Sequence, residues 1–162
     1  MQTSDEFAQS LRLASTLHRS AKLRGIRLND LEAKVFNRRL DPPYDVSTEL
    51  EPSISVAERE VTFQVAYEVT AEAEGEEIFK IKCEFQAGYS HELESVSDEM
   101  VSTFGNVIVL ATLHPYAREL VHRVSSDLGF PGLFLDSFDT KDLFLLLSEE
   151  RIQKPPLDEN YN

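Results

Sequence analysis

The sequence predicts an α+β fold in which a four-stranded antiparallel sheet is backed by a long kinked helix and a short C-terminal helix, with a further helix at the N-terminus. Apolar and polar residues alternate with a period of two through most of 26–89, which is typical of strands with one buried face. A helical stripe of apolar residues runs through 113–128, and a weaker stripe runs through 3–24. A chain of 162 residues is long enough to bury one sizeable core.

The N-terminal segment 3–24 is expected to form an amphipathic helix. Ser4 is a suitable N-cap, Gly25 is a suitable end, and Phe7 and Leu11 begin the apolar face. Because this face is modest, it favours docking on the chain's own domain or on a partner subunit over a membrane-surface or calmodulin-type helix. We therefore divide the chain into an N-terminal helical extension at 1–25, an α+β domain at 26–150 and a flexible tail at 151–162.

Four strands are expected between residues 26 and 89. Alternation marks strands at 46–56, 61–72 and 79–86, and a shorter first strand is expected around 31–35. The glycine-centred segment EAEGEE predicts a hairpin turn. Short turns between neighbouring strands predict antiparallel pairing.

The polar face of that sheet is expected to be largely acidic. Four of its carboxylates are candidates for docking a basic partner, namely Asp30, Glu68, Glu72 and Glu84. The alternative is an ordinary solvated face. Residues 1–40 carry a net charge of +4 and the remainder carries −17, which sum to the −13 of the whole chain. Such a body repels nucleic acid and attracts basic partners or positively charged unfolded chains, although acidity by itself also serves solubility.

The strongest helical stripe contains Leu113, Tyr116, Leu120 and Val124. The stripe by itself leaves open whether it packs in a private core, forms an oligomer contact or holds another molecule. Pro115 permits two interpretations, because it either begins a new helix capped by Thr112 or kinks one longer helix. Gly129 and Pro131 are expected to end this helix. A short final helix, capped by Thr140, is expected at 141–151.

No catalytic or metal-binding constellation is recognisable in the sequence. The four histidines are widely separated, and no motif of a metalloprotease, a serine hydrolase or a phosphate-binding loop is present. The single cysteine, Cys83, excludes an internal disulfide and has the inward parity of a strand, so it is expected to be a small core residue. We expect no enzymatic activity, no cofactor and no metal. We expect a cytoplasmic location without direct membrane insertion, because the N-terminus is not a secretory signal and no apolar run is long enough to cross a membrane.

The segment HPYARELVHRVSSDLGFPGL resembles the C-terminal signature of SecB, a family of bacterial export chaperones. The family's Pro-Tyr-Ala-Arg-Glu element matches residues 115–119, and its Phe-Pro-x-Leu element matches 130–133. The segment IKCEFQAGY at 81–89 resembles the family's fourth strand, and residues 142–144 resemble the start of its last helix. The resemblance covers residues 26–148.

The resemblance implies subunits with a four-stranded sheet, a long helix and a short helix, which pair into dimers and stack through the long helices into a homotetramer. It implies that the helical stripe contacts both the sheet and a neighbouring subunit's helix through Leu113, Tyr116, Leu120 and Val124. It implies that unfolded clients bind hydrophobic grooves between the sheet, the crossover segment and the helices. It also implies that the motor ATPase SecA docks on the acidic face, where Glu84 and Asp30 match acidic positions and Lys82 replaces an apolar one. The N-terminal helix resembles the extension of SecB-like chaperones that accompany toxin–antitoxin pairs, and His114 replaces a usual aromatic residue.

The primary hypothesis is an ATP-independent holdase that keeps preproteins unfolded for Sec-dependent export. Apolar residues in or beside the connecting segments are candidates for its client groove, namely Tyr89, Met100, Phe104, Phe134, Phe138 and Phe144. Ordinary packing is the alternative for each of them. One alternative function is a dedicated SecB-like chaperone that binds an antitoxin, and a second is a small α+β ligand-binding domain or enzyme. The expected partners are unfolded preproteins or an antitoxin, with SecA as a further candidate and no nucleic acid.

Overall fold

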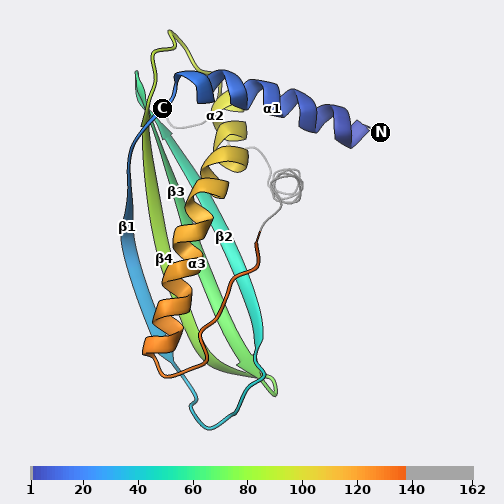
Figure 1. The fold of residues 1–162 in the computed structure, drawn as a ribbon, viewed down its shortest axis with the longest axis vertical. Helices are drawn as coiled ribbons and strands as arrows, with labels where there is room; N and C mark the ends of the chain where they lie inside the picture. Colours follow the sequence, from blue (N-terminus) through green and yellow to red (C-terminus); the bar gives the residue numbers. More distant parts are fainter. Residues whose placement is uncertain (1, 138–162) are drawn as a thin grey trace, which may run out of the picture.

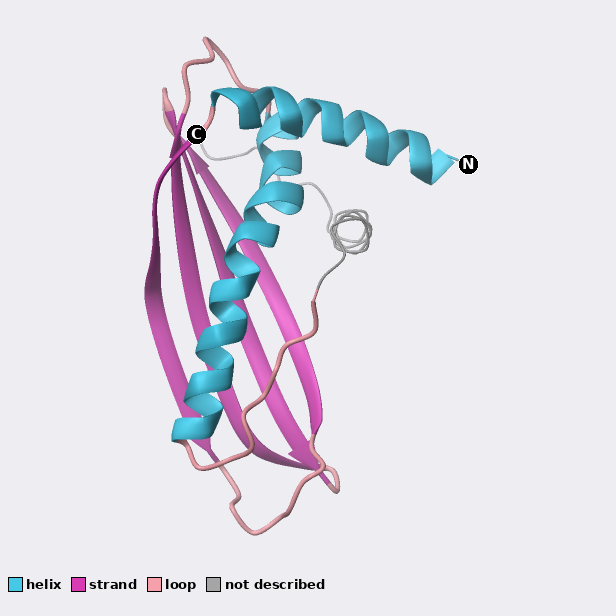
Figure 2. Ribbon diagram, viewed as in Figure 1, coloured by secondary structure: helices cyan, strands magenta, loops and turns pink. Residues whose placement is uncertain are grey.

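The structure is a computed structural model, which describes residues 2–137 (Figures 1 and 2). Helix α1 precedes four strands, and a second helical region follows them. In chain order the elements are α1 (Gln2–Ser20), β1 (Lys22–Val35), β2 (Asp45–Val56), β3 (Glu60–Ala73), β4 (Glu76–Ser90), α2 (Asp98–Phe104), the π-helical turn η1 (Gly105–Val109) and α3 (Leu110–Asp127). The expected final helix at 141–151 and the expected tail at 151–162 lie outside the described residues.

The four strands form one antiparallel sheet in the order β1-β4-β3-β2, which confirms the predicted α+β fold. The predicted hairpin between β3 and β4 is also confirmed. Glu74 and Gly75 have φ angles of 53° and 80°, as a two-residue turn between twisted strands requires. Because β1 and β2 lie at opposite edges, segment 36–44 crosses the lower end of the sheet between them (Figure 1).

Strand β1 begins nine residues before the short strand that was expected around 31–35, and α1 ends at Ser20 rather than at residue 24. Gly25 therefore lies inside a strand and does not end a helix. The pairing of β1 with β4 shifts register between Leu23 and Gly25 and again between Leu28 and Asp30. Each β-bulge adds one residue and reverses the alternation, so the period of two is hidden in the sequence.

The second helical region runs continuously from Asp98 to Asp127. Ser97 is its N-cap, and the Ser97 side chain accepts a hydrogen bond from the backbone N–H of Met100. Pro115 lies inside α3, and the Thr112 hydroxyl donates to the carbonyl of Ile108, four residues earlier, at 2.8 Å. The interpretation in which Thr112 caps a new helix is therefore wrong, and the long helix is kinked. Its irregular turn is η1, in which the N–H of Leu110 reaches back five residues to the carbonyl of Gly105.

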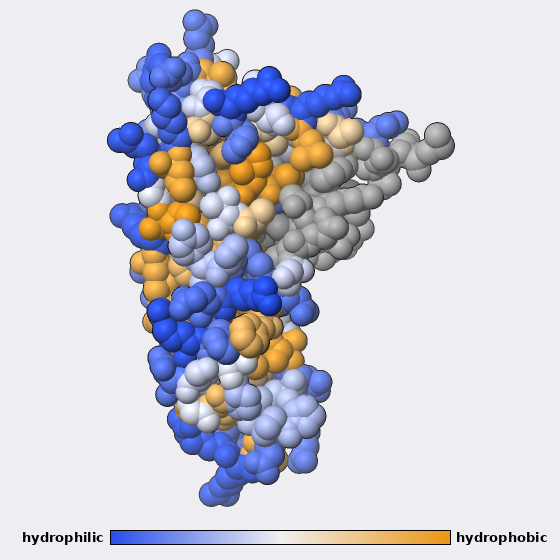
Figure 3. Space-filling model, viewed as in Figure 1, coloured by the Kyte–Doolittle hydropathy of each residue, from blue (hydrophilic) through white to orange (hydrophobic). Residues whose placement is uncertain are grey.

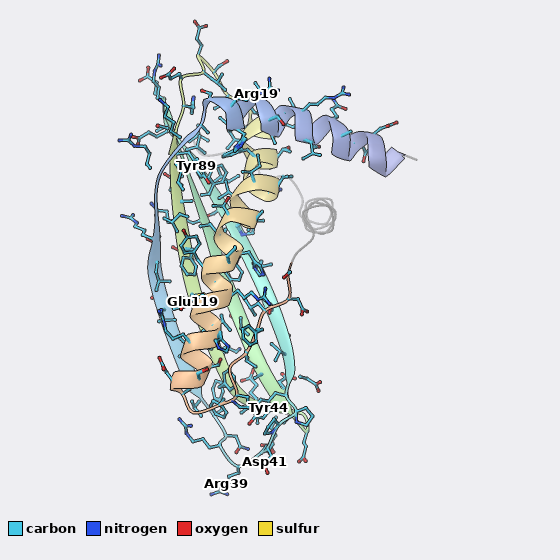
Figure 4. The ribbon with its side chains drawn as sticks, viewed as in Figure 1. Arg19, Arg39, Asp41, Tyr44, Tyr89 and Glu119 are labelled. Atoms are coloured by element: carbon cyan, nitrogen blue, oxygen red, sulfur yellow. The ribbon has the colours of Figure 1, made fainter. Side chains whose placement is uncertain are left out.

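The lower end of the long helix is tied to the crossover segment. Gly129 has a φ of 87° and follows the C-cap of α3, which confirms its predicted role. The ring of Phe130 stacks on Phe79 at 4.5 Å between centroids and meets the edge of Tyr44 at 6.0 Å. The Arg38 guanidinium donates to the carbonyl of Leu128 at 2.7 Å. Tyr44 is labelled at this end in Figure 4.

The core lies between the sheet and the long helix. Inward residues of β3 and β4 are buried along the length of both strands, and Tyr67, Phe79 and Ile81 are among its largest members. Helix α1 lies across the upper end of this layer, where Ala14 and Leu17 are fully buried (Figure 1). The sheet and the two helical regions therefore share one core.

The variant Gly105→Ala is expected to lower the free energy of unfolding, because η1 packs directly on the sheet at this point. An added Cβ would lie 2.5 Å and 2.8 Å from two ring carbons of Phe63. Because both contacts fall below 3.0 Å, overpacking is expected to cost about 2–3 kcal/mol, the upper part of its usual range, whereas the better helix propensity of alanine restores about 1 kcal/mol. We expect a net loss of about 1–2 kcal/mol in urea denaturation.

Gly88→Ala is the matched control, since a Cβ at Gly88 has no atom within 4 Å. Its change should stay within about 0.5 kcal/mol. A Gly105→Ala variant as stable as the natural chain would contradict the close approach of η1 to Phe63.

Candidate functional site

The long helix covers the two central strands but leaves the inward faces of both edge strands partly open. The inward apolar residues of β1 that stay exposed are Leu23, Leu28 and Leu31, and those of β2 are Val46, Ile54 and Val56. Each is 37–49% exposed. The register places Leu31 opposite Cys83 and Ile54 opposite Phe63, so these side chains point toward the helix layer. We call the two sets the β1 flank and the β2 flank; Figure 3 shows apolar surface on both sides of the helix.

A shallow apolar groove lies on the β2 flank between strand β2 and η1. Its lining consists of Pro52, Ser53, Ile54, Phe63, Gln64, Val65, Gly105, Asn106, Val109 and Leu110. The absence of a side chain on Gly105 allows η1 to approach Phe63 closely. Polar residues in this lining, among them the nearly buried Asn106, present no accessible polar surface to the groove. The groove therefore offers a small apolar contact surface.

The segment after α3 runs back along the β2 side of the helix (Figure 1). Within it Leu135 is buried, whereas Phe134 is 66% exposed. Phe134 was expected to contact clients, and the structure places it on the surface of the protein, on the β2 side of the long helix. Phe138 and Phe144, which were expected to act with it, lie outside the described residues.

Tyr89 and Phe104 are core residues, so the expectation that they lack a core of their own is corrected. Their rings meet edge to face at 5.1 Å, and both contact Phe63. In Figure 4 Tyr89 is labelled at the upper end of the sheet, beside the long helix. Met100 is partly buried beside this cluster. The sequence did not indicate that α1 and α2 close this end of the sheet.

The residues expected to contact a neighbouring subunit's helix are divided between two environments. Leu113 and Leu120 are buried against the sheet of their own subunit, which corrects the expectation that they also serve a neighbour. Val124 is partly buried. Tyr116 is 50% exposed, and its ring lies 6.4 Å from Phe85 of β4. Tyr116 is therefore the most exposed member of this set.

The polar face of the sheet carries two kinds of carboxylate. Asp30 lies opposite Glu84 on the neighbouring strand, and Glu84 accepts a hydrogen bond from Asn29 at 3.0 Å. Glu72 is paired in register with Asp45 on one side and Glu77 on the other. At these positions, carboxylates on neighbouring strands lie beside one another without a basic residue between them in the register.

Glu68, in contrast, lies between two lysines of β4. Its carboxylate oxygens are 2.9 Å from the Lys80 ammonium and 3.1 Å from that of Lys82. Hydrogen bonds from Lys80 and then Lys82 hold the pKa of Glu68 below its ordinary value. The charge of Glu68 is thus compensated within the chain, so Asp30, Glu72 and Glu84 are better placed to attract a basic partner.

A buried histidine links the long helix to the segment that follows it. The His114 Nε2 lies 2.7 Å from the carbonyl oxygen of Asp136, and its Nδ1 lies 3.5 Å from the Tyr67 hydroxyl. Burial lowers the pKa of His114, and the nearby Arg118 charge acts in the same direction. Burial also raises the pKa of the Cys83 thiol to about 11, which suits a core residue.

Among residues 2–137 no group of three or more His, Cys, Asp or Glu side chains is placed to hold a metal ion. None of the helices in this part of the chain is long and apolar enough to cross a membrane. Sequence reasoning did not identify the open edge-strand residues as a surface. It also gave no role to Arg118 and His122, which lie one helical turn apart beneath Phe134. Their i,i+4 spacing was the available signal.

The sequence model of a family described as preprotein translocase subunit SecB matches residues 28–151. Among solved structures, the chain is similar to the Mycobacterium tuberculosis Rv1957 SecB-like chaperone, which was solved in complex with a ChAD peptide from the Rv1956 HigA1 antitoxin. That match has 22% identity and a TM-score of 0.74, and covers 79% of this chain and 97% of the other.

A protein of unknown function from Streptococcus agalactiae matches with 14% identity and a TM-score of 0.37, over 72% of this chain and 96% of the other. This score is too low to support an argument. A search of curated proteins finds no match to the chain. Helix α1 ends before residue 28, so it precedes the part that the family model matches.

The stability of the chain is expected to fall as the pH is lowered from 7 to 5, and His114→Phe should weaken this dependence. Because burial holds the folded-state pKa of His114 below the ordinary value near 6.5, the unfolded state binds the proton more readily. The stabilising contribution is complete above the ordinary pKa and is lost as the pH falls toward the folded-state pKa. Urea denaturation at both pH values measures it.

Thr112→Ser provides the control, because Thr112 lies on the same helix and the change removes no titratable group, so it should keep the pH dependence of the natural chain. Equal pH dependence in the natural chain and His114→Phe would contradict the assignment of this effect to His114.

Proposed function

The chain belongs to the SecB family, and on that premise we propose that it is an ATP-independent chaperone that binds extended segments of non-native polypeptide. The observation that carries the proposal is the partly open inward face of the edge strands, with apolar side chains on both flanks of the long helix. Covering apolar surface contributes about 25 cal/mol per Å² before the entropy cost of binding. Several weak contacts along one client chain would add to a useful affinity.

We assign the two flanks to different partners within this proposal. The β2 flank carries the groove beside Gly105 and the exposed Phe134, so it suits the side chains of a client. The β1 flank lies on the same side of the long helix as Tyr116. We propose that a second copy of the chain covers the β1 flank and Tyr116. Pairs of dimers would then form the homotetramer, with a native mass near four times the 18.4 kDa of one chain.

The favoured client is an intrinsically unfolded segment of an antitoxin. The support is the likeness in fold to a SecB-like chaperone solved with an antitoxin peptide. Helix α1 lies outside the family match and is available to add partner specificity. Both this role and export would place the chain in the cytoplasm.

Export of preproteins is the second candidate function, because the matching family is described as a subunit of the preprotein translocase. In that case SecA would dock on the polar sheet face through Glu84 and Asp30. Purification of the chain from the cells that encode it separates the two roles. A single small partner in fixed stoichiometry favours the antitoxin role, and a spread of preproteins favours export.

The double variant Ile54→Ser and Val56→Ser should bind unfolded polypeptide about tenfold more weakly than the natural chain, because two partly exposed apolar contacts are lost. Reduced, carboxymethylated α-lactalbumin is a suitable unfolded probe, and fluorescence anisotropy of the labelled probe measures the Kd. The matched control is Ser47→Ala with Ser55→Ala, on the same strand but on the opposite face. Equal affinity of the natural chain and the Ile54/Val56 variant would exclude the β2 flank as the client surface.

A further inference from the structure

The chain after α3 is fastened to the helix on both sides of Phe134. On one side the backbone N–H of Leu133 donates to the Ser125 hydroxyl at 2.9 Å. On the other side the Arg118 guanidinium donates to the Ser137 hydroxyl at 3.1 Å, and the carbonyl of Asp136 lies 2.7 Å from His114. Leu135 is buried between these contacts. The backbone that carries Phe134 therefore has a fixed path.

Gly132 permits the close approach of this segment to the helix. A Cβ at this position would overlap the imidazole of His122 and lie 2.7 Å from the Ser126 hydroxyl. A side chain here would lift the segment away from α3. Gly132 thus lets the chain lie close enough to α3 for Phe134, two positions later, to contact the helix surface.

The ring of Phe134 lies flat against two side chains of α3, those of His122 and Arg118. It stacks on the imidazole of His122 with 4.0 Å between ring centroids and 20° between planes. The guanidinium carbon of Arg118, one helical turn away, lies 5.7 Å from the ring centre. Two-thirds of the side chain nevertheless remains open to solvent. An exposed aromatic side chain usually has no stacking partner, whereas this ring contacts two side chains of α3.

The Nδ1 atom of His122 is buried without a hydrogen-bond partner. A buried polar atom of this kind is unfavourable, so the position is not explained by hydrogen bonding. The ring of His122 is instead used for its flat surface, on which Phe134 lies. A phenyl ring would supply the same surface without the unpaired nitrogen.

We propose that His122 and Arg118 are positioning residues that hold Phe134 as a preformed contact for an aromatic or aliphatic side chain of the bound polypeptide. This inference rests on the proposed chaperone function and deepens it. A rigid aromatic side chain loses little conformational freedom on binding, which is a property of the residues that contribute most to interfaces. Because Phe134 is largely exposed, it contributes to binding far more than to folding.

The position of the ring can be measured without a client. The chain contains no tryptophan, so Phe134→Trp introduces a single tryptophan, whose fluorescence can be excited selectively over that of the five tyrosines. Time-resolved anisotropy should show little nanosecond rotation of the side chain in the natural background. His122→Ala should release this rotation, and His122→Phe should suppress it again. Equal local rotation in all three backgrounds would overturn the positioning role.

Client affinity provides the second measurement, with reduced, carboxymethylated α-lactalbumin as the probe. Phe134→Ser should raise the Kd about fivefold, and His122→Ala about threefold, because the ring is lost in the first case and only released in the second. His122→Phe should restore the natural value. Phe36→Ser is the matched control, since Phe36 is also an exposed phenylalanine beside a cation but lies after β1. It should leave the Kd unchanged.

The outcomes separate this inference from the proposed function. If the natural chain binds the probe and Phe134→Ser binds it equally well, the inference is overturned while the chaperone function stands. If the natural chain does not bind the probe, the proposed function fails and the client contact at Phe134 fails with it. Urea denaturation of each variant establishes that it is folded, and Phe134→Ser should unfold at nearly the natural urea concentration.

Discussion

One helix cannot cover four strands, and the surface of this protein follows from that limit. An α-helix with its side chains is about 10 Å wide, whereas neighbouring strands lie about 4.8 Å apart. The long helix therefore closes the inward faces of β3 and β4 and leaves those of β1 and β2 partly open. The apolar residues of the edge strands are consequently half-exposed although they have the same inward parity as core residues. A partner that covers them completes a layer that the chain alone leaves incomplete.

Local sequence signals predicted the parts of the fold that depend on neighbouring residues. Alternation marked the three strands that carry no extra residue of their own near their centres. The Glu74-Gly75 turn and the Gly129 helix end were predicted from backbone conformations that favour glycine. Strand β1 was predicted too short because two bulges reverse its alternation. Pro115 was ambiguous because the sequence does not show whether the surrounding packing keeps one helix continuous. The structure keeps it continuous and places the irregular turn earlier, at η1.

The candidate site was harder to predict because exposure depends on elements distant in sequence. Periodicity shows which residues point inward, but it does not show whether a helix lies over them. Tyr89 and Phe104 were expected to lack a core, and the packing of the long helix and α1 gives them one. Val46, Ile54 and Val56 belong to the apolar set of the strand predicted at 46–56, and the width of the helix leaves them open. Phe134 was predicted as a client contact from its place in an apolar loop. Its contacts with Arg118 and His122 could not be predicted, because they depend on how the loop packs on α3.

Methyl NMR of the chain during titration with reduced, carboxymethylated α-lactalbumin tests the central claim most directly. The account predicts that the methyl signals of Val46, Ile54 and Val56 on the β2 flank shift or broaden, while those of the buried Val69 and Ile81, which lie away from the groove, stay unchanged. It predicts no change at Thr62, Ala66 and Thr70, which lie on the opposite face of the sheet. Perturbation confined to that opposite face, with the β2 flank unaffected, would contradict it.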